Sequence, residues 1–226
     1  MHGKVVVITG ASGALGKVVA DAAIACGARV ACIDRTAADG DATTSRIHLG
    51  GVDLSDAALA MKAIDAAASH FGRLDVLINI AGAFAFETVA DGDPSTWQRL
   101  YAINVATALN ASRAAIPHLL ASGAGRIINI GAMAALQAGA GMGAYAASKA
   151  GVHRLTEALA AELKGKVTVN AVLPTIIDTP ANRKDMPKAD FATWVTADEL
   201  ANVILFLASD AASAVTGALV PVRGRI

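Results

Sequence analysis

Two residues with catalytic potential, Tyr145 and Lys149, lie four positions apart in the segment 143–149. In a helix this spacing places a phenol and an ammonium group on one face, one turn apart. A cation beside a tyrosine favours the phenolate and lowers its pKa, and such a phenol can act as a general acid or base. The same spacing also arises by chance on solvated helices. The pair therefore indicates catalysis only if the rest of the chain supplies a cofactor site.

The elements that must position this pair follow from the apolar pattern of the chain. The Tyr145 helix comes after a buried strand and a glycine-rich loop, and the polar segment 36–46 is expected to be a loop. Strands are expected at residues 4–8, 29–33, 47–52, 74–80, 126–130, 166–172 and 217–222. Helices are expected from the first glycine turn to about residue 26, and at about 56–71, 93–121, 143–163 and 196–208. This alternation predicts a single domain over residues 1–226, an α/β fold with one doubly wound parallel sheet.

A glycine-rich turn joins the first expected strand to the first helix. The cofactor contacts expected there come from Gly10, Ser12, Ala14, Leu15 and Gly16. The glycines let the backbone approach a pyrophosphate, whose negative charge suits the N-terminus of the following helix. With the flanking strand and helix in place, the turn predicts a dinucleotide site rather than an ordinary tight turn.

The choice between NAD and NADP depends on the residues at the end of the second strand. Asp34 stands there and can accept hydrogen bonds from the ribose on the adenine side. A carboxylate at this position repels a 2′-phosphate, so NAD(H) is favoured. The neighbouring Arg35 is either a solvated loop residue or a guanidinium that holds a phosphate, so NADP(H) stays possible.

Three further positions suit a ligand site. Asp53, after the third strand, either accepts from the adenine amino group or helps to cap the next helix. Ala81 and Gly82 follow the fourth strand, where small residues let a ligand lie against the strand end. Asn104 is expected in mid-helix, which is mildly unfavourable, so its side chain either points into a site or is merely tolerated.

The composition excludes several classes of function. Lys+Arg and Asp+Glu are balanced at 19 each, which gives no support for binding to nucleic acid. The longest uncharged run, within 127–148, contains four Gly together with Asn and Gln, so it indicates a strand and loop rather than a membrane span. The start of the chain lacks a signal-peptide pattern, and a cytoplasmic enzyme is expected. Cys26 and Cys32 are expected to be core thiols rather than a disulfide, and no metal-ligand spacing is present.

With these pieces placed, the chain resembles the short-chain dehydrogenase/reductase family along nearly its whole length. The matching segments are TGASGALG at 9–16, Asp34, Asp53, NIAG at 79–82, Asn104, YAASK at 145–149 and the segment 174–179. The resemblance implies a Rossmann sheet of seven strands with helices on both faces, a nicotinamide cofactor, and hydride transfer to or from a carbonyl or related unsaturated group. It adds cofactor contacts from Leu54, Asn79, Ala81, Gly82, Pro174, Ile177 and Thr179.

The resemblance also implies a role for each candidate catalytic residue. Tyr145 would pass the proton, and Lys149 would bind the nicotinamide ribose and lower the pKa of Tyr145. Asn104 would hold a water in a proton relay. The family further implies a homodimer or homotetramer built on the helices near 96–121 and 143–163, and a short substrate lid at about 180–198.

The chain departs from the family pattern at Ala132. The family usually has a serine thirteen positions before its tyrosine, and this chain has alanine there. Loss of one donor to a developing oxyanion typically costs about 10²–10³-fold in rate. Three explanations are open. The substrate needs no such donor, or another group such as Gln137 replaces the serine hydroxyl. Alternatively, the protein is a weak or inactive NAD-binding member of the family that serves as a sensor or a structural subunit. Gln137 is otherwise a loop residue bonded to backbone.

A narrower resemblance accounts for the alanine. The segments 131–155 and 173–194 resemble the dihydropteridine reductase branch of the family, which lacks the serine and reduces a quinonoid dihydropterin with NADH. Such a substrate is a strongly electrophilic conjugated imine, for which an oxyanion donor matters less. Ala132 and Met133 would border the substrate. Phe191 and Trp194 either stack on a flat ring or pack the lid onto the protein, and His153 is expected to be a packing or subunit-contact residue.

Overall fold

The structure is a computed structural model that describes residues 1–37 and 42–225. In this described part, seven strands form one parallel sheet with the order β3-β2-β1-β4-β5-β6-β7. The strands are β1 (Val5–Thr9), β2 (Arg29–Ile33), β3 (Arg46–Leu49), β4 (Val76–Asn79), β5 (Gly125–Ile130), β6 (Val167–Pro174) and β7 (Leu219–Val222). The predicted α/β fold with a doubly wound parallel sheet is confirmed.

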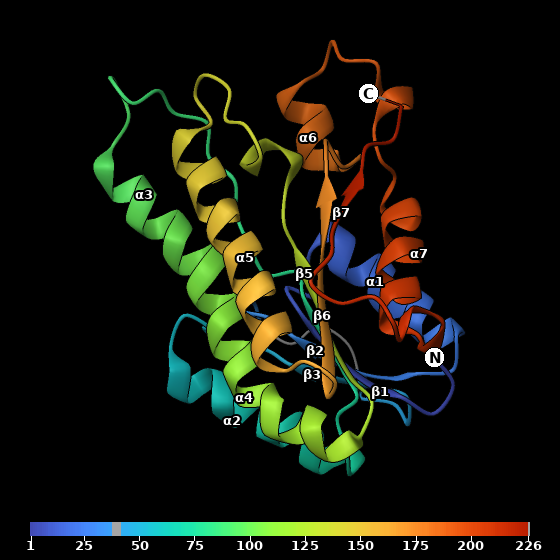
Figure 1. Ribbon diagram of the computed structural model, residues 1–226. Coiled ribbons are helices and arrows are strands. Elements are labelled where there is room, and N and C mark those ends of the chain that lie inside the picture. Colours follow the sequence, from blue (N-terminus) through green and yellow to red (C-terminus); the bar gives the residue numbers. More distant parts are fainter. Residues whose placement is uncertain (38–41, 226) are drawn as a thin grey trace.

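Helices cover both faces of the sheet (Figure 1). The α-helices are α1 (Ala14–Ala25), α2 (Ala57–Phe71), α3 (Pro94–Tyr101), α4 (Thr107–Ser122), α5 (Gly143–Glu162), α6 (Pro180–Asp185) and α7 (Ala197–Ala208). Helices α2, α4 and α5 pack on one face, and α1 and α7 pack on the other.

The core follows from the alternation of side chains along the strands. Val5 and Val7 of β1 belong to the cluster under α2, α4 and α5, whereas Val6 and Ile8 belong to the cluster under α1 and α7. Successive side chains of a strand point to opposite faces, so a strand covered on both faces is apolar throughout. The two buried layers hold the carboxyl ends of the strands in register at one edge of the sheet.

Polar side chains cap several of the helix starts. Asp93 caps α3 with Pro94 in its first turn, and its carboxylate accepts from the backbone of Ser95. Thr196 and Glu199 form a capping box at the start of α7. Asp56 caps α2 by accepting from two backbone N–H groups. These caps satisfy N–H groups that the helix itself leaves without partners.

Several expected boundaries are wrong, including the starts of β4, at Val76 rather than residue 74, and of β7, at Leu219 rather than residue 217. The third strand was expected to reach residue 52, but β3 ends at Leu49 because the backbone turns at Gly51 with φ of 73°. The fourth strand, β4, ends at Asn79, because Thr9 Oγ1 accepts from the next two backbone N–H groups. Arg46 belongs to β3 rather than to the expected loop at 36–46, of which residues 38–41 lie outside the described part.

The long helix expected over 93–121 is also interrupted. A π-helical turn, Ala102–Ala106, separates α3 from α4, and Asn104 lies inside it. π-helical turns inside α-helices occur frequently at functional sites. The interruption places Asn104 on the buried side, with 1% of its surface exposed.

The two cysteines differ in their surroundings. Cys32 is buried in β2 as expected, and both thiols are free. Cys26 is exposed, so the expectation of a core thiol is wrong at this position. It caps the C-terminus of α1 directly before Gly27, where the chain leaves the packed face.

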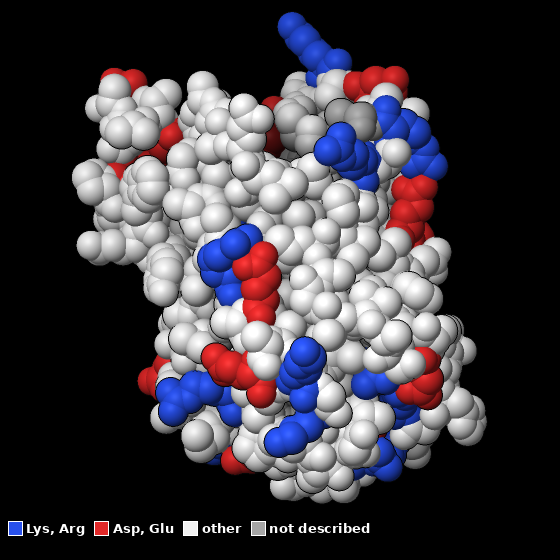
Figure 2. Space-filling model, viewed as in Figure 1, with Lys and Arg blue, Asp and Glu red and all other residues white. Residues whose placement is uncertain are grey.

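The surface shows no obvious charged docking region on the face drawn in Figure 2, where Lys and Arg lie interspersed with Asp and Glu. Over residues 1–37 and 42–225, none of the helices combines the length and hydropathy that crossing a membrane requires.

Candidate active site

A cavity of about 550 Å³ opens at the carboxyl ends of the strands. Its walls come from the segments that follow β1, β2, β4 and β5, from the start of α5 and from the segment after β6. Predicted site residues in its lining are Gly10, Ser12, Ala14, Leu15, Gly16, Asp34, Arg35, Asp53, Leu54, Ala81, Gly82, Tyr145, Lys149, Ile177 and Thr179. Tertiary structure thus brings the glycine turn, the acid of the second strand and the Tyr–Lys pair to a single cavity.

The glycine turn forms a cradle at the N-terminus of α1. Gly10 has φ of 66°, and a Cβ there would lie 2.8 Å from the backbone of Ala81. A Cβ on Gly16 would lie 2.2 Å from the carbonyl oxygen of Gly10. The N-cap of α1 is Gly13, which has no side chain to cap the first-turn N–H groups. These groups remain available to an anion, so the turn fits a dinucleotide pyrophosphate.

The Asp34 carboxylate is held by the backbone. It accepts hydrogen bonds from Ser12 N–H at 2.9 Å and from Thr36 N–H at 3.0 Å. Burial raises the pKa of Asp34, but the hydrogen bonds from Thr36 and Ser12 outweigh burial and hold the pKa below its ordinary value. Asp34 is therefore charged at neutral pH and retains acceptor capacity for ribose hydroxyls.

Asp53 does not cap the following helix. Its Oδ1 accepts from the backbone and hydroxyl of Ser55, at 2.9 Å and 2.7 Å, while Asp56 caps α2 instead. The capping alternative is therefore wrong for Asp53. Asp53 lines the cavity, so the other alternative, that it accepts from the adenine amino group of the cofactor, stays a prediction.

Tyr145 and Lys149 lie on the first turns of α5 and both line the cavity. Lys149 is 6% exposed, and its Nζ donates to the carbonyl oxygen of Ile130 at 2.8 Å. Burial raises the pKa of Tyr145 to about 12 and lowers the pKa of Lys149 to about 8. The expected lowering of the Tyr145 pKa is therefore wrong for the protein alone, because desolvation disfavours both charged forms.

Burial of Lys149 should make stability depend on pH. Because its pKa falls from 10.5 to about 8, the folded protein loses a proton above pH 8 that the unfolded chain keeps up to about pH 10.5. The free energy of unfolding therefore rises with pH in this window. Between about pH 7 and pH 10, wild type is expected to gain roughly 2–3 kcal/mol relative to Lys149→Met in denaturant unfolding. If the free energy of unfolding changes equally with pH in the two proteins, the lowered pKa of Lys149 would be contradicted.

Asn104 joins the two sides of the site. Its Oδ1 accepts from Ala83 N–H at 2.9 Å, and its Nδ2 donates to Ala83 O at 3.0 Å and to Ser148 Oγ at 2.9 Å. Ser148 in turn donates to the carbonyl oxygen of Tyr145 at 2.8 Å. The Asn104 side chain therefore has specific buried partners beside the site rather than being merely tolerated, but it is not part of the described cavity lining.

Ala132 is buried beside His153. The Ala132 N–H donates to His153 Nε2 at 3.3 Å, and His153 is 1% exposed. Burial, with smaller effects from the charges of Arg154 and Lys149, lowers the pKa of His153 to about 4, so the ring is neutral at pH 7. A Cβ on Gly131 would lie 2.5 Å from His153 Nε2. His153 thus packs inside the protein, and the alternative of a surface contact is wrong.

Other predicted residues lie outside the described cavity lining. Trp194 is 2% exposed and contacts Phe191 with ring centroids 4.8 Å apart, and Phe191 also lies under the guanidinium of Arg183. The remaining ones are Asn79, buried in β4; Asn104 and Ala132, both buried; Pro174, at the end of β6; Met133, partly buried; and Gln137, exposed in the loop before α5.

Several lining residues were not predicted. They are Gly13, Thr36, Val52, Ile80, Ala83, Phe84, Ile103, Thr107 and Ile130. Most of them neighbour predicted residues in sequence. Phe84 had a signal of its own, since it is an aromatic residue two positions after Gly82 in a chain with few aromatics. Within 1–37 and 42–225, no group of three or more His, Cys, Asp or Glu residues is arranged to hold a metal ion.

The chain is similar to known dehydrogenases and reductases along nearly its whole length. Residues 4–190 match the protein family described as short chain dehydrogenase. Galactitol 2-dehydrogenase (L-tagatose-forming) of Cereibacter sphaeroides is 37% identical over 245 residues, covering 99% of this chain and 95% of that protein. D-threitol dehydrogenase of Mycolicibacterium smegmatis is 34% identical over 241 residues, covering 99% and 93%. The structure of 3-ketoacyl-(acyl-carrier-protein) reductase from Brucella melitensis, complexed with NADH, matches with a TM-score of 0.88 at 29% identity, covering 100% of this chain and 99% of that one.

Proposed function

The chain belongs to the short-chain dehydrogenase family, and on that premise we propose an NAD(H)-dependent reductase of a carbonyl or conjugated imine. The observation that carries the proposal is the meeting of Tyr145, Lys149, Asp34 and the glycine turn in one cavity. The nicotinamide ring, when bound, would supply the hydride. The cradle at α1 would hold the pyrophosphate, and Asp34 would hold the ribose on the adenine side.

The proton would come from Tyr145. With its pKa raised to about 12, the phenol is protonated at neutral pH and can donate to the reacting oxygen or nitrogen. Lys149 uses one of its three donors on Ile130 O and has two left for ribose hydroxyls or the Tyr145 oxygen. Both Asn104 N–H groups are engaged, so a relay water would donate to Oδ1. These residues would deliver the proton while the cofactor site holds the reactants together.

The substrate class follows from Ala132. The alanine offers no hydroxyl to a developing oxyanion, and its own N–H already donates to His153. A strongly electrophilic conjugated imine needs such a donor less, which favours a quinonoid dihydropterin reduced by NADH. The test is NADH oxidation by the purified protein with quinonoid dihydropterin, with NADPH run in parallel. Fast turnover that prefers NADH supports the proposal, whereas no turnover with tight NADH binding argues against it.

The second candidate is an NAD-binding protein with weak or lost catalysis, for which Ala132 is the observation. Replacing Ala132 with Ser should discriminate between the two. If the site is competent and lacks only the hydroxyl, kcat on simple ketones is expected to rise by about 10²-fold, the usual worth of one oxyanion donor. Steady-state NADH oxidation measures this gain. If wild type and Ala132→Ser both bind NADH but neither turns over, the second candidate would be favoured.

The preference for NADH should depend on the charge of Asp34. Replacing Asp34 with Ser is expected to lower the ratio of kcat/KM for NADH over NADPH by about ten- to hundredfold, because it removes the carboxylate that repels a 2′-phosphate. The matched control is Asp198→Asn, which removes an exposed carboxylate on α7 outside the described cavity lining. An unchanged ratio in the Asp34 variant would shift the cofactor assignment to Arg35.

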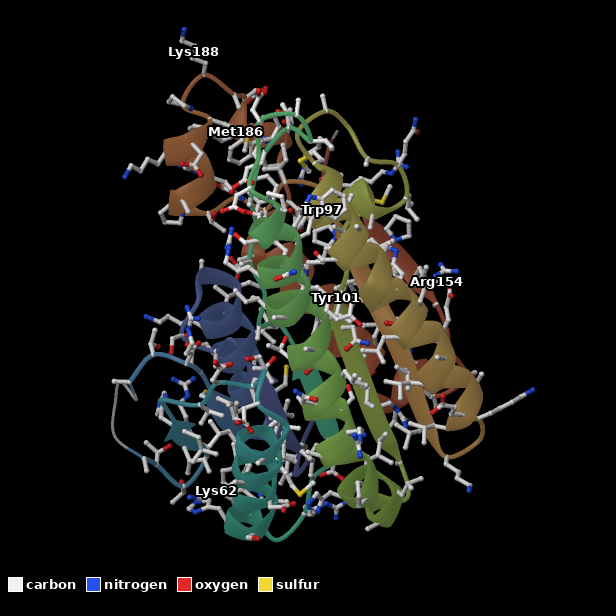
Figure 3. The ribbon with its side chains drawn as sticks, turned by 90° about the vertical axis from the view of Figure 1, so that its left-hand side faces the viewer. Lys62, Trp97, Tyr101, Arg154, Met186 and Lys188 are labelled. Atoms are coloured by element: carbon white, nitrogen blue, oxygen red, sulfur yellow. The ribbon has the colours of Figure 1, made fainter. Side chains whose placement is uncertain are left out.

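We further propose that the protein acts as a homodimer or homotetramer. Exposed Trp97 and Tyr101 on α3 lie beside α5, whose Arg154 faces the same side (Figure 3). Two aromatic side chains at 43% and 57% exposure, one turn apart on α3, suit a subunit contact. Light scattering at micromolar concentration tests this, and a monomer would contradict it.

A further inference from the structure

Phe84 is an aromatic residue in the cavity that the reaction outlined above does not use. It lies in the segment between β4 and α3, and it is 53% exposed although it lines the same cavity as Tyr145. Its ring meets the Tyr145 ring edge-on, with centroids 4.9 Å apart and planes at 76°. Contact with Tyr145 thus leaves about half of the Phe84 surface uncovered beside the group that transfers the proton.

The backbone before Phe84 is held by a buried residue. Asn104 binds both backbone polar groups of Ala83, accepting from its N–H and donating to its carbonyl oxygen. Asn104 is 1% exposed and sits in the π-helical turn between α3 and α4. These two hydrogen bonds to a buried side chain restrict the backbone directly before Phe84, and the contact with Tyr145 favours one position of the ring.

The surroundings of Phe84 differ from the adenine end of the cavity. The charged lining residues Asp34, Arg35 and Asp53 follow β2 and β3, at one edge of the sheet. Phe84 and Tyr145 lie beside β4 and β5, where Ile103, Ile130 and Ile177 complete the wall. Among the described lining residues, Lys149 is the charged side chain at this end. Apart from Tyr145, Lys149, Thr107 and Thr179, the wall at this end is apolar, and such a wall with an exposed aromatic ring suits a flat conjugated ligand.

We propose that Phe84 determines specificity by packing against the ring of a flat, conjugated heterocyclic substrate and holding its reacting atom at the Tyr145 hydroxyl. The proposal rests on the proposed reductase function and names the substrate class of that site. A ring in this position would contact the open surface of Phe84 in an offset or edge-on geometry, the arrangement that aromatic pairs prefer. An acyclic substrate would gain little from the same wall.

The test compares Phe84→Leu and Phe84→Tyr on two substrates of the same reaction class, quinonoid dihydropterin and the acyclic diketone butane-2,3-dione. Phe84→Leu keeps apolar volume but loses the ring, so KM for the dihydropterin is expected to rise about three- to tenfold with little change in kcat. Phe84→Tyr keeps the ring and should retain the wild-type KM. Kinetics with butane-2,3-dione should stay at wild-type values in both variants.

Phe86→Leu is the matched control, because Phe86 is 64% exposed, lies two positions further on, packs at Gly141 and is outside the described cavity lining. It should leave both substrates unaffected. Equal losses on both substrates in Phe84→Leu, or no loss on either, would overturn the proposal.

A binding measurement separates this proposal from the proposed reaction. Fully oxidised pterin, a flat ring that accepts no hydride here, serves as the probe in a fluorescence titration with NADH present. Suppose that neither substrate turns over, but that the protein binds oxidised pterin and Phe84→Leu weakens this binding about three- to tenfold. The role of Phe84 is then still supported, although the proposed reaction fails. If the protein reduces butane-2,3-dione but neither reduces nor binds the pterin rings, the reductase function stands and the flat-ring proposal is overturned.

Discussion

Replacing Tyr145 with Phe is expected to lower kcat by about 10²–10⁴-fold, the range that a positioned general acid contributes. The phenylalanine keeps the ring and its edge-on contact with Phe84 but loses the hydroxyl that would donate the proton. NADH binding should be largely retained, because the glycine turn and Asp34 are untouched. Steady-state NADH oxidation measures the loss, and NADH fluorescence titration measures the binding.

Tyr101→Phe is the control for this experiment. Tyr101 is the other tyrosine of the chain, lies at the end of α3 and is 57% exposed. Removing its hydroxyl should leave kcat unchanged. Full activity of Tyr145→Phe would remove Tyr145 from the catalytic assignment, while loss of NADH binding in that variant would mean that the hydroxyl serves the cofactor rather than the chemistry.

The second large effect is expected at Gly16. An alanine there would place its Cβ 2.2 Å from Gly10 O and 2.7 Å from Ala11 Cα, and both are backbone atoms that cannot move as a side chain would. By helix propensity alone, the change to alanine would stabilise α1 by about 1 kcal/mol. Overpacking of about 1–3 kcal/mol should displace the turn instead and raise the Kd for NADH about ten- to hundredfold.

Isothermal titration of NADH measures this effect, and thermal unfolding of the cofactor-free variant shows whether the fold itself has suffered. Gly139→Ala is the control, since an added Cβ at this exposed loop position meets no described atom closer than 4.0 Å. Wild-type affinity in the Gly16 variant, with the fold intact, would show that the turn can bind the cofactor without this close approach.

The sequence determined the parts of this protein that depend on local pattern. Apolar runs predicted the strands, and the helix starts near residues 93 and 196 could be placed because the capping residues Asp93 and Thr196 act within a few residues of the chain. The glycine turn, Asp34 and the Tyr145–Lys149 spacing could be read for the same reason. Each works through a backbone geometry or a side-chain spacing that the chain itself specifies.

The ends of strands and helices were less predictable where a residue far away in the sequence forms hydrogen bonds with the backbone. β4 ends at Asn79 because the hydroxyl of Thr9, seventy positions earlier, accepts hydrogen bonds from the next two backbone N–H groups. The expected long helix contains a π-helical turn at Asn104, whose side chain bonds to Ala83 and Ser148. No spacing rule along the chain anticipates these contacts, since the partners come together only when the sheet and helices pack.

The electrostatics of the site were decided by tertiary structure alone. From the sequence, an ammonium near a phenol lowers the phenol's pKa, yet burial raises the pKa of Tyr145 and lowers that of Lys149. Likewise, the buried ring of His153 accepts from Ala132, and Phe84 meets Tyr145 across the cavity. Desolvation depends on every atom packed around a group, whichever part of the chain supplies it. The sequence therefore determined which groups could react. The packed fold decided which of these groups carry charge and which side chains lie next to them.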